Sequence, residues 1–135
     1  MDKTTRFMRL LCFAVALAAC FTDCARRSPQ PQDPAIWKKI ALDFKRIDEQ
    51  GLSGPPDGKV AVNYEFCIPA EAAKWKEVSR IDPSAQRHEQ AKGRVNCGPD
   101  QWLVIGSTHQ PEYKLKLYKL ASLPYVTVIR QAFWE

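Results

Sequence analysis

The chain has 135 residues, of which 45% are hydrophobic and 26% are charged, and its formal net charge is +5. This balance, with no low-complexity tract and no repeat of fixed period, excludes a disordered chain, a protein that crosses a membrane several times and a repeat array. We expect one globular domain with a modest core, because chains below about 150 residues bury a limited share of their surface.

Residues 1–19 are typical of an export signal. Lys3, Arg6 and Arg9 form a basic start, and the run at 10–19 that follows has no polar side chain. A membrane-spanning helix needs roughly 20 apolar residues, so this run is too short to remain as an anchor. We therefore predict that these residues form a signal peptide that is removed.

The signal ends in a motif that suits lipid attachment. The four residues Leu17-Ala18-Ala19-Cys20 resemble the lipobox of bacterial lipoproteins, in which a branched apolar residue and two small residues precede a cysteine. The resemblance implies that the Cys20 sulfur receives a diacylglyceryl group, that a peptidase cuts just before it, and that the new amino group is acylated. Several acyl chains would make this attachment stable, since each buried methylene adds about 0.8 kcal/mol.

The residue after the acylated cysteine indicates the compartment. In bacterial lipoproteins an aspartate at that position directs retention in the inner membrane, and this chain has Phe21 instead. The resemblance therefore implies a protein of the cell envelope that is anchored by lipid in the outer membrane and faces the periplasm. An ordinary signal-peptidase site near Ala16-Leu17-Ala18 is the alternative, and it would leave Cys20 as a thiol or a disulfide partner.

Residues 20–33 are predicted to be the lipidated N-terminus and a proline-rich tether, and a single globular domain is expected at 34–135. Alternating prolines between Ser28 and Pro34 favour an extended, semi-rigid segment. Removal of the signal peptide takes away three of the 20 basic and one of the 15 acidic residues, which leaves 17 − 14 = +3. With no basic stripe interleaved with aromatic residues, we expect no nucleic-acid partner.

The start of the domain has the pattern of an amphipathic helix over 33–51. Asp33 is a suitable N-cap, and Gly51 is suited to end the run. One face carries apolar residues at spacings of four and three, namely Ile36, Ile40, Phe44 and Ile47. Core packing is the usual role of such a face, and binding of a partner is the alternative.

The middle of the chain predicts a strand, a helix and a second strand. Over 60–68 every second residue is apolar, with Cys67 on the other, more polar face. Residues 69–81 have helical spacing, 83–100 are polar and mostly without period, and 101–108 form a short apolar run typical of a buried strand. This order predicts a βαβ-like unit with parallel strands and a minimal sheet.

The C-terminal third is ambiguous between helix and strand. We predict helices at 111–123 and 125–134, although Val126, Val128 and Ile129 also favour a strand. The expected fold class is α+β, or small α/β, with an N-terminal amphipathic helix, the βαβ-like unit and C-terminal helices.

The cysteines separate by position. Cys12 leaves with the signal and Cys20 takes the lipid, so three cysteines remain in an oxidising compartment. Cys67 ends one predicted strand and Cys97 precedes the next, so we predict a disulfide between them, worth about 3 to 4 kcal/mol on the chain-entropy model. Cys24 is left over in the tether, where it either stays reduced or pairs between molecules.

No catalytic motif or metal-binding pattern is present in the sequence, and no cofactor is expected. His109 follows a predicted strand, and Ser107, Thr108 or His109 is expected to cap the helix that comes next. His88 lies in the polar loop and is expected to be solvated. An enzyme that uses Cys67, His109 or Glu65 is the less favoured alternative.

The chain is loosely similar in architecture to small periplasmic immunity lipoproteins. The similarity lies in its size, its single predicted disulfide and the absence of a catalytic motif. That similarity implies a protein that binds an envelope-targeted toxin and blocks it by occlusion. The alternative is a structural or accessory envelope lipoprotein that supports an assembly or cell-wall attachment. Both interpretations imply a protein partner, and the membrane is contacted through the N-terminal lipid.

Overall fold

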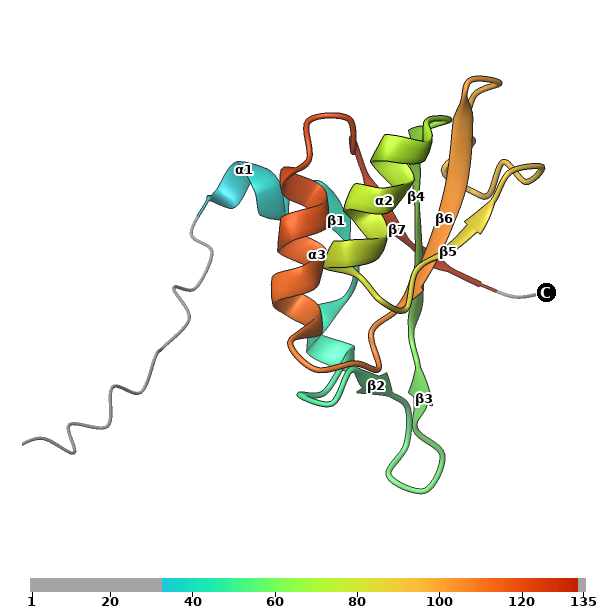
Figure 1. The fold of residues 1–135 in the computed structure, drawn as a ribbon. Helices are drawn as coiled ribbons and strands as arrows, with labels where there is room; N and C mark the ends of the chain where they lie inside the picture. The colour runs from blue at the N-terminus through green and yellow to red at the C-terminus, as the bar shows by residue number, and fades with distance from the viewer. Residues whose placement is uncertain (1–32, 134–135) are drawn as a thin grey trace, which may run out of the picture.

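The computed structural model describes residues 33–133, so the predicted signal peptide, Cys20, the tether and Cys24 lie outside the described residues. The described part contains helices, short strands and one 3-10 turn (Figure 1). In chain order they are α1 (Pro34–Trp37), β1 (Ile40–Ala41), the 3-10 turn (Phe44–Arg46), β2 (Leu52–Ser53), β3 (Val60–Ala61), β4 (Asn63–Pro69), α2 (Ala72–Ile81), β5 (Gln86–His88), β6 (Gln101–Ser107), α3 (Tyr113–Ser122) and β7 (Ile129–Ala132).

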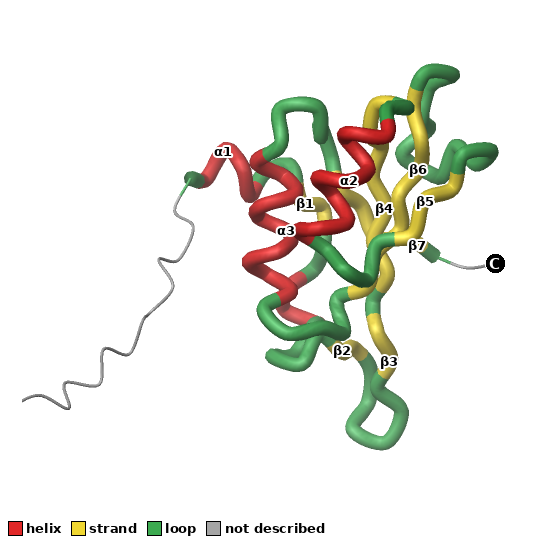
Figure 2. The backbone as a smooth tube through the Cα atoms, in the orientation of Figure 1, coloured by secondary structure: helices red, strands yellow, loops and turns green. Residues whose placement is uncertain are grey.

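A mixed five-stranded sheet forms the centre of the domain, in the order β1-β7-β4-β6-β5. The strand β4 pairs antiparallel with both β6 and β7, whereas β1 pairs parallel with β7. The strands β2 and β3 form a separate antiparallel hairpin. Helices α2 and α3 lie on one side of the sheet (Figures 1 and 2), so the predicted α+β class is confirmed.

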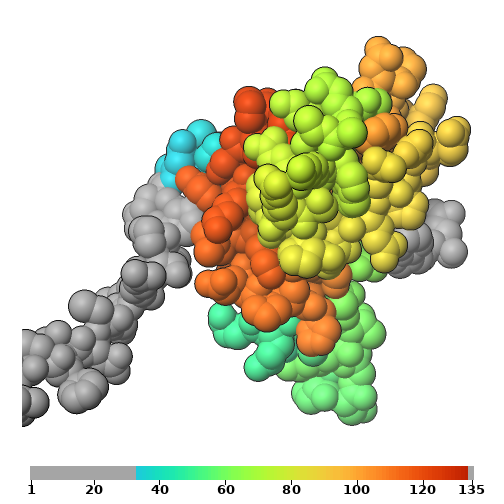
Figure 3. Space-filling view, in the orientation of Figure 1, coloured from blue at the N-terminus to red at the C-terminus, as the bar shows by residue number. Residues whose placement is uncertain are grey.

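The core lies between this sheet and the two longer helices. Register places Phe66 opposite Val104 on one face of the sheet, and both side chains are fully buried. The helices contribute Val78 from α2 and Leu117 and Leu120 from α3. The space-filling view shows α2 and α3 covering this face (Figure 3).

The predicted helix over 33–51 is wrong in its length. Asp33 caps the helix as expected, with its Oδ1 accepting from the backbone N–H of Ala35 at 2.8 Å, but α1 ends at Trp37. Ile40 then enters the sheet, because β1 pairs with β7 at the open edge. Asp43 turns the chain by accepting from the N–H of Lys45. The predicted apolar face is nevertheless in or against the core, with Ile40 and Ile47 buried and Ile36 and Phe44 partly buried.

The predicted parallel pairing of the two middle strands is also wrong. The strands β4 and β6 are neighbours and antiparallel over seven residue pairs, from Asn63–Ser107 to Pro69–Gln101. The region at 83–100, which has no strand pattern in the sequence, contains the strand β5, which pairs antiparallel with β6. Since β4 and β5 both oppose β6, they run in the same direction, so the parallel crossover through α2 joins β4 to β5 with β6 inserted between them.

The C-terminal predictions are half right. The helix predicted over 111–123 is confirmed as α3. The helix predicted over 125–134 is wrong, because Ile129–Ala132 forms β7 between β1 and β4. A strand here satisfies backbone groups on both neighbouring strands, and the β-branched Ile129 is fully buried against the helices.

Candidate functional site

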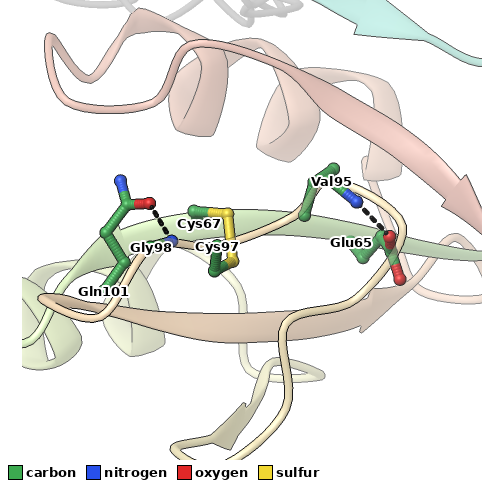
Figure 4. Close-up of a disulfide and its surroundings, with 6 residues drawn as sticks. All are labelled: Glu65, Cys67, Val95, Cys97, Gly98 and Gln101. Carbon is green, nitrogen blue, oxygen red and sulfur yellow. Dashed lines mark hydrogen bonds between the residues drawn. A yellow bond between two sulfur atoms is a disulfide. The ribbon is translucent and has the colours of Figure 1, made fainter.

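The predicted disulfide between Cys67 and Cys97 is present, with a Cα–Cα distance of 5.5 Å. Cys67 comes from β4, the central strand, and Cys97 comes from the loop between β5 and β6 (Figure 4). Cys97 is almost completely buried. The bond therefore holds that loop against the face of the sheet opposite the helices.

Hydrogen bonds hold the same loop at further points. The backbone N–H of Val95 donates to Oε1 of Glu65 at 2.9 Å, and the N–H of Gly98 donates to Oε1 of Gln101 at 2.9 Å (Figure 4). Gly93 has a φ of +62°, and a Cβ there would come within 2.6 Å of Leu103 Cδ1. Glycine is thus required for the loop to approach the sheet this closely.

The sheet face under the loop can be read from the register. On β6, Leu103 pairs with Cys67 on one side and His88 on the other, and Ile105 pairs in the same way with Glu65 and Gln86. Directly opposed residues share a face, so these side chains point away from the helices. Strand β6 is consequently apolar on both faces, and the loop covers part of the second face.

A pocket of about 260 Å³ lies between the loop, this sheet face and the C-terminal end of β7. We call it the loop pocket. Its walls combine apolar side chains with three that carry polar or charged groups, and they are formed by Glu65, His88, Ala91, Gly93, Arg94, Leu103, Ile105, Ala132 and Phe133.

The polar groups of the loop pocket differ in their surroundings. Glu65 is only 5% exposed, and among the described residues it forms a hydrogen bond with Val95 and no ion pair. The Nε2 atom of His88 is buried without a hydrogen-bond partner. Arg94 lies over the ring of Phe133, with 5.1 Å from its guanidinium carbon to the ring centroid, and that ring is 57% exposed.

The catalytic alternative raised by the sequence required Cys67 and His109 to meet. Cys67 lies four residues along β4 from Asn63, the register partner of Ser107, which corresponds to about 13 Å. The Nδ1 atom of His109 instead lies 3.0 Å from the carbonyl oxygen of Gln50. The structure does not bring the two side chains together.

The expected capping of α3 by Ser107, Thr108 or His109 is wrong. The N-cap of α3 is Glu112, with a φ of 55° and no side-chain cap hydrogen bond. The hydroxyl of Thr108 is buried, accepts from the N–H of Val62 at 3.1 Å and lies 2.6 Å from the carbonyl oxygen of Gly51. It therefore joins the end of β6 to the turn just before β2 and to the junction of β3 and β4, rather than to the helix.

Of the residues that line the loop pocket, only Glu65 is a candidate from the sequence, and Arg94 and Phe133 have no role predicted from it. The expectation that His88 is solvated is wrong, because its side chain is partly buried and its Nε2 atom is fully so. The consecutive apolar residues of β6 were a usable signal, because a strand that is apolar on both faces needs a cover on each.

A group of three or more histidine, cysteine, aspartate or glutamate side chains able to hold a metal ion is absent from residues 33–133. Within the same range, each helix is too short or too polar to cross a membrane. Comparisons of the chain with protein-family models, with curated proteins and with solved structures give no match.

Proposed function

We propose that this protein is a small lipid-anchored binding protein that faces the periplasm and neutralises an envelope-targeted toxin by occlusion. The observation that carries the proposal is the sheet face opposite the helices, where the disulfide holds a loop and a pocket in place. A surface that is rigid before binding loses little conformational entropy when a partner docks, which favours tight occlusion.

The placement of the chain's most reactive side chains supports binding over catalysis. Cys67 is already bonded to Cys97, and His109 is engaged with a backbone carbonyl group. Glu65 holds a backbone N–H of the loop. Each of these side chains has a structural partner, which is consistent with a rigid domain that binds a partner through its surface.

The position at which the described chain begins also supports the proposal. Figure 1 shows α1, where the described chain begins, on the helical side of the domain, and β5 with its following loop on the other side. A lipid attached at Cys20 would hold the domain from the helical side. The loop pocket would then be presented to proteins that arrive from the periplasm.

The test is a competition between cells. The gene for this chain is deleted in its host, and the deletion strain is grown in contact with parental cells that deliver their own toxins. We expect the deletion strain to be killed and to be rescued by the intact gene. A deletion strain that survives contact but has a weakened envelope would favour the accessory lipoprotein instead, and one that shows neither effect would refute both.

A further inference from the structure

The loop pocket contains a carboxylate, that of Glu65, which forms no ion pair with a described residue. Glu65 is 5% exposed, and Oε1 accepts one backbone N–H bond from Val95. Figure 4 shows the second carboxylate oxygen pointing away from Val95, and no described residue donates a hydrogen bond to it. Within residues 33–133 only Nε2 of His88 is a buried polar side-chain atom without a partner, so this second oxygen of Glu65 is open to the pocket, where a cation can pair with it.

The rest of the pocket suits a group that carries an apolar stem. Leu103 and Ile105 form its floor on β6, and Ala91 and Ala132 add small apolar walls. Its volume of about 260 Å³ is below the range of about 300 to 1,000 Å³ that is usual for drug-sized ligands. One side chain of a partner protein matches this volume better than a large cofactor.

We propose that the loop pocket receives one basic side chain, arginine or lysine, from the protein partner, with its cationic end at Glu65. This inference rests on the proposed function and adds the place and the chemistry of contact. Arginine and lysine have methylene stems that pack along apolar surface and a charged end that pairs with a carboxylate.

The arrangement at the rim leaves Glu65 available to such a group. Arg94 lines the pocket, and its guanidinium group lies over the ring of Phe133. Arg130 is opposite Glu65 in the register of β4 and β7 and is exposed, and no ion pair joins these two side chains. The exposed ring of Phe133 adds an apolar contact at the mouth.

The test uses amino-acid amides as probes of the pocket. The full chain is exported, purified in detergent micelles and titrated with N-acetyl-arginine amide while the backbone amide signals of Gly93 and Val95 are followed by NMR. N-acetyl-citrulline amide is the matched probe, because it keeps the shape of the arginine side chain and lacks its charge. We expect saturable shifts with the arginine probe and at least about tenfold weaker binding of the citrulline probe.

Glu65→Gln is the decisive variant. Its amide oxygen keeps the bond from the Val95 N–H, so the loop is expected to stay in place, and an unchanged amide spectrum outside the pocket verifies the fold. We expect the variant to bind the arginine probe about tenfold more weakly. Glu89→Gln is the control, because Glu89 lies in the same loop but pairs with Arg87, and it should bind the probe as the parent does.

Equal binding of the charged and neutral probes would overturn the proposal, and so would binding that is unaffected by Glu65→Gln or no binding at all. The competition between cells is a separate readout. If Glu65→Gln still protects cells fully while the probes fail to bind, the pocket proposal falls and the proposed function stands. If the probes bind as expected and the deletion strain survives contact, the pocket binds a basic group and the proposed function falls.

Discussion

Asp82 is the buried carboxylate that organises one end of the core. It is fully buried at the end of α2, and it accepts hydrogen bonds from the hydroxyl of Tyr64 at 2.5 Å, the side-chain amide of Gln110 at 2.9 Å and the backbone N–H of Ser84 at 2.9 Å. These bonds join β4, α2 and the segment before α3. A buried charge that is satisfied in this way fixes the relative positions of its partners.

Tyr64 gives this network a pH dependence. Burial, and then the negative charge of Asp82, raise the pKa of Tyr64 well above its ordinary value of 10.0. In the unfolded chain the phenol ionises near its ordinary pKa while the folded form stays neutral. The contribution of Tyr64 to the free energy of unfolding is therefore fully present below about pH 10. It decreases as the pH rises further, because the unfolded chain then loses a proton that the folded chain keeps.

We expect Tyr64→Phe to flatten this alkaline loss of stability. The urea midpoint is measured between about pH 8 and pH 11 for both proteins, in a Cys24→Ser background that limits disulfide exchange. The loss should be reduced but not abolished, because the pKa values of Tyr113 and Tyr125 are raised as well. Parallel curves for the two proteins would contradict the assignment to Tyr64.

His88 provides the opposite case of a polar atom that lacks a partner. Its Nε2 atom is buried and makes no hydrogen bond to a described residue. A buried polar atom without a partner costs about 1 to 3 kcal/mol, so an apolar residue of similar size removes a penalty. We expect His88→Leu to raise the free energy of unfolding by about 1 kcal/mol in urea denaturation. A loss of similar size would show that His88 has a favourable contact that the geometry does not reveal.

At the scale of elements, burial was predictable from the sequence and conformation was often not. All four residues of the predicted face in 33–51 are in or against the core, yet only the first, Ile36, lies in an α-helix. Helical spacing indicates which side chains face the core. A segment made of turns and short strands can bury the same side chains without being a helix. Strand pairing of Ile40 with Ile129 at the sheet edge competes with continuation of the helix.

The missed strand β5 has a related cause. Gln86, Arg87 and His88 have polar side chains and show no apolar alternation, so the pattern typical of a strand is absent. Backbone pairing with β6 forms the strand, and Arg87 covers the core face by lying over Trp102, with 4.3 Å from its guanidinium carbon to the ring centroid. Only the partner strand makes this segment regular, and single-sequence patterns do not contain that information. The loop pocket was hidden for the same reason, since β5 supplies His88.

The loop between β5 and β6 depends on the disulfide. The bond closes a loop across 30 residues of sequence, and on the chain-entropy model its loss lowers the free energy of unfolding by about 3 to 4 kcal/mol. We expect the double variant Cys67→Ala/Cys97→Ala to show this loss in urea denaturation. It should also show faster amide exchange at Val95, which reports release of the loop from Glu65. A matched Cys24→Ser variant should leave both quantities unchanged, and equal exchange at Val95 in the double variant would show that hydrogen bonds alone hold the loop.

At the scale of the whole molecule, the domain has two different sides. Helices α2 and α3 cover one face of the sheet, and the other face carries the disulfide, the loop and the pocket. The sequence allowed the disulfide and the α+β class to be predicted because both follow from local pattern and cysteine position. The two-sided arrangement depends on strand order, and strand order depends on pairings between distant segments.

The proposed function joins this two-sided domain to a lipid that the sequence predicts at Cys20. Under this proposal, attachment would concentrate the protein at the surface where the toxin acts, so the anchor and the binding face would contribute separately to protection. We expect Cys20→Ser to accumulate as an unprocessed, unlipidated precursor that no longer fractionates as a lipoprotein. Its core is unaltered, so its thermal unfolding should match that of the parent, while protection in the competition between cells should fall sharply.

A Cys24→Ser variant is the matched control and should be lipidated and protective. Normal processing and membrane attachment of Cys20→Ser would refute the lipobox interpretation, and full protection by a verified unlipidated form would show that the binding face works without its anchor.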